Sequence, residues 1–204
     1  MIALVDRPSI SFDDFMAWYP EQSEHRYELK RGFIVEMPKP RGTHSKLAGD
    51  LAYELGTAIR KAQADFFIPR DCVIKLTDDT GYEPDVIVLE AIAVAEEPRW
   101  ERESVITKPE SIKLAIEIVS TNWRDDYLVK LADYEAFGIQ EYWIVDYLGL
   151  GGRRYIGVPK QPTLSVCVMK AGEYEIHQFR RGDRLVSPLF PNLSLAMDQI
   201  FPGS

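Results

Sequence analysis

Two short apolar runs of this chain each carry a carboxylate. Asp85 directly precedes the run at 86–89 (VIVL), and Glu117 lies inside the run at 114–119 (LAIEIV). Runs of this length and β-branched content are typical of buried strands. Alternate residues of a strand face opposite ways, so Glu117 should share its face with Ala115. An ionised carboxylate there needs a charged partner, and the chain must fold so that both acids find one.

Carboxylate oxygens are the ligands that hard divalent cations prefer. Mg²⁺ or Mn²⁺ needs only one or two carboxylates and a backbone carbonyl from a protein, because it keeps several waters. Asp85 and Glu117 are therefore candidate metal ligands. The alternatives are a turn residue at strand entry for Asp85 and a water-facing edge residue for Glu117. The apolar neighbours of Glu117 disfavour the second alternative.

Lys130 is a candidate source of compensating charge. It lies on a helix expected from about residue 123 to residue 137, which begins after Thr121 or Asn122 and stops at Gly138. From spacing alone, the preferred interpretation of Lys130 is a solvated residue that pairs with a neighbouring aspartate on the helix surface.

Periodicity and turn residues predict alternating strands and helices along the rest of the chain. Residues 77–81 predict a polar turn, and residues 91–110, with two prolines, predict a connection with little regular structure. The strand, helix, strand order after residue 112 predicts a right-handed parallel crossover. The expected helices cover 11–18, 43–62 (capped by Thr43) and 123–137, and the expected strands cover 26–30, 33–37, 66–68, 72–76, 85–89, 112–119, 141–145, 155–158, 164–169 and 174–179.

An ordered series of short motifs spans most of the chain. The motifs are Tyr27-Glu28-Leu29 with Gly32, the helix that begins at His44, Glu83-Pro84-Asp85-Val86, Glu117-Ile118-Val119-Ser120, Lys130 with Tyr134, and the segment from Gly138 to Asp146. The series resembles the PD-(D/E)xK nuclease superfamily, and in particular its Uma-type family of restriction-endonuclease-like proteins. Each motif alone is weak, whereas the ordered series is far more specific.

One position departs from the superfamily pattern. The lysine of that pattern normally lies two residues after the glutamate, where this chain has Val119. The resemblance implies that the lysine has moved to the following helix, as Lys130. It also implies a restriction-endonuclease-like α/β fold, with a mixed sheet flanked by helices. We expect one domain over residues 1–204, with an N-terminal helix and hairpin at 10–40, a nuclease-like core at 41–148 and a C-terminal antiparallel β extension at 149–204.

The function that the resemblance implies is Mg²⁺-dependent (or Mn²⁺-dependent) hydrolysis of DNA phosphodiester bonds. Asp85, Glu117 and the carbonyl of Ile118 would hold the metal, and Lys130 would orient water or offset phosphate charge. Glu28 and His44 would assist. Two alternatives remain open: a binding or regulatory protein that keeps the fold without turnover, and a metal-dependent hydrolase of another phosphoester.

Composition limits the expected partners. The 24 Lys and Arg residues face 32 Asp and Glu residues, a net charge of −8, which is the opposite of a strongly basic nucleic-acid footprint. A local basic strip, at residues 99–113 or 153–160, remains compatible with DNA.

Cys72 and Cys167 have neither pairing nor metal-ligand spacing and predict buried free thiols. Residues 1–6 lack the features of a signal peptide, and no run reaches about 18 apolar residues, so we expect a cytoplasmic protein without a membrane segment. A homodimer is expected because cutting both strands of DNA needs two sites.

Overall fold

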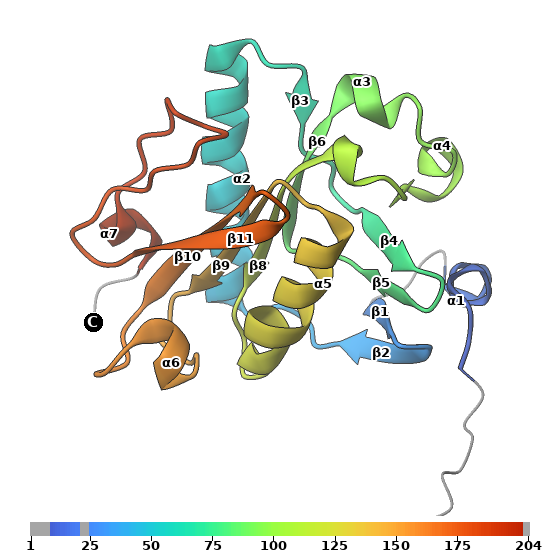
Figure 1. The fold of residues 1–204 in the computed structure, drawn as a ribbon, viewed down its shortest axis with the longest axis horizontal. Coiled ribbons are helices and arrows are strands. Elements are labelled where there is room, and N and C mark those ends of the chain that lie inside the picture. Colours follow the sequence, from blue (N-terminus) through green and yellow to red (C-terminus); the bar gives the residue numbers. More distant parts are fainter. Residues whose placement is uncertain (1–8, 21–24, 202–204) are drawn as a thin grey trace, which may run out of the picture.

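The computed structural model describes residues 9–20 and 25–201, and its strands form two sheets with helices packed around them (Figure 1). The signal-peptide expectation concerns residues 1–6, which lie outside the described residues. Among the helices that are described, none is long and apolar enough to cross a membrane.

The larger sheet has six strands in the order β11-β10-β9-β8-β6-β3. Its central pair, β8 and β9, is parallel, as the crossover pattern predicts, and its other neighbouring strands are antiparallel. The predicted C-terminal extension is confirmed as two strands that continue this sheet. The strands are β3 (Phe66–Phe67), β6 (Val86–Glu90), β8 (Ile112–Ile118), β9 (Glu141–Asp146), β10 (Thr163–Lys170) and β11 (Glu173–Phe179).

The smaller sheet has five strands in the order β2-β1-β5-β4-β7. The predicted hairpin is confirmed, and Arg31 and Gly32 make its turn with φ values of +51° and +77°. Helix α1 (Phe12–Trp18), capped by Ser11, packs Phe12 and Phe15 against this sheet. The strands are β1 (Arg26–Lys30), β2 (Phe33–Met37), β4 (Val73–Thr77), β5 (Thr80–Tyr82) and β7 (Val105–Ile106).

Helices cover both faces of the six-stranded sheet (Figure 1). On one face lies α2 (Gly42–Ala62), whose leucines at positions 47, 51 and 55 recur every four residues and form a buried stripe. The C-terminal helix α7 (Met197–Ile200) joins the same cluster. On the other face lie a π-helical turn (Asp125–Lys130), α5 (Leu131–Phe137) and α6 (Arg153–Ile156). Strand β8 alternates as predicted, because Leu114 packs on the α2 side and Ala115 on the α5 side.

The structure corrects several local predictions. Helix α2 begins at Gly42 with Arg41 as its cap, so Thr43 is not the cap. The expected turn at 77–81 is shorter than predicted, because Thr77 ends β4 and Thr80 begins β5, and the strand expected at 155–158 is instead the end of α6, which Gly157 terminates at a φ of +86°. Four residues between glycines carry too little periodicity to separate a helical turn from a strand.

The connection at 91–110 is also ordered, contrary to prediction. It contains α3 (Ala91–Val94), α4 (Trp100–Glu103), β7 and a 3₁₀ turn (Pro109–Ser111). The buried carboxylate of Glu97 organises it by accepting hydrogen bonds from the hydroxyls of Thr107 and Ser111, both at 2.7 Å, and from the backbone N–H groups of Thr107 and Lys108, both at 3.0 Å. Such a non-periodic carboxylate network leaves no pattern in the sequence.

Candidate active site

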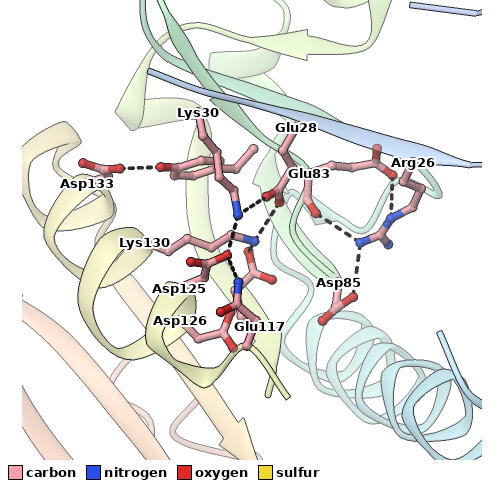
Figure 2. Close-up of polar contacts among 12 residues, drawn as sticks. Arg26, Glu28, Lys30, Glu83, Asp85, Glu117, Asp125, Asp126, Lys130 and Asp133 are labelled. Carbon is pink, nitrogen blue, oxygen red and sulfur yellow. Dashed lines mark hydrogen bonds and ion pairs between the residues drawn. The ribbon is translucent and has the colours of Figure 1, made fainter. Parts of the chain in front are cut away.

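The candidate site lies where the two sheets meet (Figure 2). Glu28 comes from β1 of the smaller sheet, Asp85 immediately precedes β6, and Glu117 lies on β8 of the larger sheet. Lys130 comes from the end of the π-helical turn. Four elements that are far apart in the sequence therefore bring their charged side chains to one place.

Lys130 points inward rather than to solvent. Its side chain is 2% exposed, and its Nζ lies 2.7 Å from Glu28 Oε1 and 2.8 Å from Glu117 Oε1. The hydroxyl of Tyr134, one helical turn on, donates to the same Glu117 oxygen at 2.9 Å. The neighbouring Asp126 is also buried. The surface position that spacing alone favours for Lys130 is therefore wrong.

The charges around Lys130 explain the directions of its own pKa shift and of that of Glu117. Burial alone lowers the pKa of Lys130, but Glu117, Glu28 and Asp126 outweigh it and raise that pKa well above its usual range. Burial raises the pKa of Glu117 to about 7 despite the opposing charge of Lys130, because Asp85 and Glu28 add repulsion. The surroundings thus favour the charged form of Lys130 and the protonated form of Glu117.

Asp85 has a different set of partners. Its Oδ2 accepts the backbone N–H of Ile118 at 2.8 Å and lies 3.3 Å from His44 Nε2, and its Oδ1 lies 3.4 Å from Arg26 Nη2. Burial works to raise the pKa of Asp85, but His44, Arg26 and the Ile118 N–H together lower it. Asp85 is therefore held ionised.

His44 bridges two of the expected metal ligands. Its Nε2 lies 3.1 Å from the carbonyl oxygen of Ile118 as well as 3.3 Å from Asp85. Burial lowers the pKa of His44, and the contact with Asp85 more than offsets that effect, so the pKa is raised. The Asp85 carboxylate and the Ile118 carbonyl consequently face the same small volume.

Comparison with known proteins gives this arrangement a context. The sequence profile of the Uma2 family, described as "Putative restriction endonuclease", matches residues 12–198. The chain belongs to the Uma2 family. No curated protein matches it. Among solved structures it resembles the protein from Anabaena variabilis ATCC 29413 described as "a putative nuclease belonging to DUF820", with a TM-score of 0.70 and 20% identity over 94% of this chain and 97% of that chain. This likeness confirms the restriction-endonuclease-like α/β class.

The donor groups of this Uma2-family protein fit a hard divalent cation in their chemistry. Asp85, Glu117 and the Ile118 carbonyl offer only oxygen, and the surrounding carboxylates outnumber the cations that pair with them (Figure 2). In the part of the chain that the structure describes, three or more His, Cys, Asp or Glu side chains do not converge on one cation position. Two carboxylates and a carbonyl are nevertheless a sufficient protein share for Mg²⁺, which keeps several waters.

The Uma2-family site also contains residues that the sequence reasoning missed. Arg26 contacts both Asp85 and Glu83, and Lys30 Nζ lies 2.6 Å from Asp125 and 3.2 Å from Glu28. Arg26, Glu28 and Lys30 are alternate residues of β1, so they share one face of that strand. Their alternation with Glu28 on one predicted strand is the signal that could have revealed Arg26 and Lys30.

Proposed function

We propose that this Uma2-family protein is a metal-dependent endonuclease that hydrolyses phosphodiester bonds of DNA. One observation carries the proposal: Glu117 lies 2.8 Å from the buried Lys130, and the Asp85 carboxylate and the Ile118 carbonyl lie 3.3 and 3.1 Å from His44 Nε2. Family membership supports a nuclease, the metal rests on the oxygen donors of the site, and the choice of DNA rests on the resemblance to restriction endonucleases. The same proposal includes the PD-(D/E)xK pattern. In this chain Lys130 would take the role of the lysine that the pattern expects at position 119, which is Val119 here.

Asp85 and Glu117, with the carbonyl of Ile118, would hold Mg²⁺ or Mn²⁺. When bound, such an ion stabilises charge on the phosphate and lowers the pKa of a coordinated water. Asp85 is suited to this role because His44 and Arg26 keep it ionised. His44, which contacts both Asp85 and the Ile118 carbonyl, would position these two ligands.

Lys130 would act as a fixed positive charge. Its raised pKa keeps it protonated, so it cannot serve as a general base near neutral pH. It can instead offset negative charge on the phosphate or orient the attacking water. Glu28 would hold the ammonium in place through the 2.7 Å contact, which makes Glu28 a positioning residue.

The charges of one candidate basic strip are already engaged. Arg99 pairs with Asp13 and Glu103, and Lys113 pairs with Glu90 at 2.9 Å. These pairs weaken the case for residues 99–113 as the surface that contacts DNA phosphates. Residues 153–160 remain the candidate basic strip in this proposal.

The test combines metal binding with cleavage. Mn²⁺ is titrated calorimetrically into the wild type and into Asp85→Asn, and the same samples are assayed on plasmid DNA with added Mg²⁺. We expect the variant to lose saturable metal binding and at least about 100-fold of its cleavage rate. Asp50→Asn is the matched control, because Asp50 is a surface partner of Lys46.

Each outcome separates the candidate functions. Metal binding without DNA cleavage, but with hydrolysis of nucleotides, would favour another phosphoester as substrate. If the wild type neither binds Mn²⁺ nor cleaves DNA, the result would favour a protein that keeps the nuclease fold only to bind a partner. Light scattering on the active sample tests the homodimer that double-strand cutting requires.

A further inference from the structure

A second concave site lies on the same face of the six-stranded sheet as Glu117 and has a different lining. A cavity of about 410 Å³ opens on the face of the six-stranded sheet that carries the π-helical turn and α6, and this volume falls within the usual range for small-molecule pockets. Its apolar lining comes from Leu131, Ile144 and Ile176. None of the candidate metal ligands lines it.

Three hydroxyl groups line this cavity, and among the described residues none of them makes a hydrogen bond of good geometry. They are Tyr127 Oη, Tyr155 Oη and Ser165 Oγ, and each of these atoms is buried. Tyr127 is 2% exposed and Ser165 is 1% exposed. Burial raises the pKa of Tyr127, and the Ser165 hydroxyl opposes that effect, which places these two groups side by side. Buried hydroxyls are normally hydrogen-bonded, so a molecule in the cavity would complete the bonding of Tyr155 and of the neighbouring Tyr127 and Ser165 hydroxyls.

Arg154 adds a positive charge at the edge of the cavity. Its guanidinium lies over the ring of Tyr155 at 4.5 Å from the centroid, and the rest of the residue is exposed. A guanidinium stacked in this way presents its N–H groups in one plane, which matches the two oxygens of a carboxylate or phosphate. The cavity therefore combines a site for an oxyanion, three hydroxyls and an apolar wall.

The cavity is pre-formed rather than loosely assembled. The carboxylate of Asp146 accepts the backbone N–H groups of Leu150 at 2.9 Å and Gly151 at 2.7 Å, which fixes the chain that leads into α6. A Cβ at Gly151 would come within 3.0 Å of the Tyr127 ring, so glycine permits this close approach. Gln178 of β11 donates to the carbonyl of Tyr155 and ties α6 to the sheet.

We propose that this cavity binds a small organic oxyanion, a carboxylate or a phosphate monoester on an apolar body about the size of an aryl ring. Arg154 binds the oxyanion, the hydroxyls of Tyr127, Tyr155 and Ser165 bind polar atoms of the ligand, and the aliphatic wall covers its body. This binding needs no metal, although Arg154 also belongs to the candidate basic strip at 153–160 of the proposed nuclease.

The experiment is isothermal titration of the full chain in EDTA, which removes any contribution of the metal site. The probes are benzoate, phenyl phosphate and the neutral benzyl alcohol. The variants are Arg154→Gln, Tyr127→Phe and Ser165→Ala, the last two of which remove a single hydroxyl and keep the packing. The matched control is Arg153→Gln, since Arg153 occupies the same helical turn but does not line the cavity.

We expect saturable binding of at least one anionic probe and much weaker binding of benzyl alcohol. Affinity should fall by about 10-fold in Arg154→Gln and by several-fold in each hydroxyl variant, while Arg153→Gln binds like the wild type. The preferred anion tells a carboxylate ligand from a phosphate ligand. Circular dichroism of each variant confirms that it is folded.

Three results would overturn the proposal. The first is no saturable binding of either anion by the folded wild type. The second is binding that all three cavity variants leave unchanged, or that Arg153→Gln weakens equally. The third is a crystal structure, soaked with both anions, in which only ordered water bonds to the three hydroxyls.

Discussion

Replacement of Lys130 by methionine tests the electrostatic account of the candidate site most directly. Methionine keeps most of the buried aliphatic volume and removes the ammonium that contacts Glu28 and Glu117 at 2.7 and 2.8 Å. Both carboxylates are buried, so the variant leaves negative charge without its partner. Removal of one partner from a buried ion pair costs about 3–5 kcal/mol. We therefore expect the free energy of unfolding to fall by about that amount at mildly alkaline pH.

The loss should depend on pH in a defined direction. In the wild type the pKa of Glu117 is already raised to about 7, and removal of the Lys130 charge raises it further. A folded-state pKa above the unfolded value means that the native state binds more protons, so stability falls as pH rises through that range. The stability deficit of Lys130→Met relative to the wild type should consequently shrink at acidic pH, where Glu117 is protonated in both proteins.

Urea denaturation followed by tryptophan fluorescence measures both effects. The control is Lys46→Met, which removes a lysine that is 75% exposed and pairs with Asp50 on α2, and which should cost less than about 1 kcal/mol at any pH. A double variant, Lys130→Met with Glu117→Gln, should recover part of the loss because it removes one unpaired charge. A Lys130→Met deficit no larger than that of Lys46→Met, or one that is constant from acidic to alkaline pH, would refute the reasoning.

Two further predictions concern packing and burial. Gly81→Ala should destabilise the fold by about 1–3 kcal/mol in urea denaturation, since a Cβ there would lie 2.4 Å from the ring of Phe12. Gly49→Ala, in open space on α2, should instead stabilise it by about 0.5–1 kcal/mol, and equal effects would contradict this account. Burial raises the pKa of Cys72 and of Cys167, so both thiols should resist iodoacetamide in the native protein and react in urea; rapid native labelling would show that they are accessible.

Local patterns were sufficient for much of the fold. The Arg31-Gly32 hairpin turn, the leucine stripe of α2 and the antiparallel β10 and β11 all follow from short-range signals in the sequence, and the structure confirms them. The parallel pairing of β8 and β9 followed from the strand, helix, strand order. These features depend on residues a few positions apart, where backbone sterics and periodic burial act directly.

Other elements depend on partners that are remote in the sequence. The connection at 91–110 is ordered by Glu97, which bonds to residues at least 10 positions away. Helix α6 was mistaken for a strand because its form is determined by packing against the sheet and the π-helical turn. Neither feature has a periodic pattern that reveals it.

The sequence by itself determined that Asp85 would lie at the start of one apolar strand and Glu117 inside another, and that both would require compensation, because burial of a charge is a local consequence of strand composition. Only the tertiary structure decided which charge compensates them. Lys130 is 13 residues from Glu117 and 102 from Glu28, and it meets both because β1 of the smaller sheet and β8 of the larger sheet come together beside the π-helical turn. The physical reason is that hydrophobic burial of whole sheets and helices brings these charges together, whereas helix spacing alone would pair Lys130 with its surface neighbours.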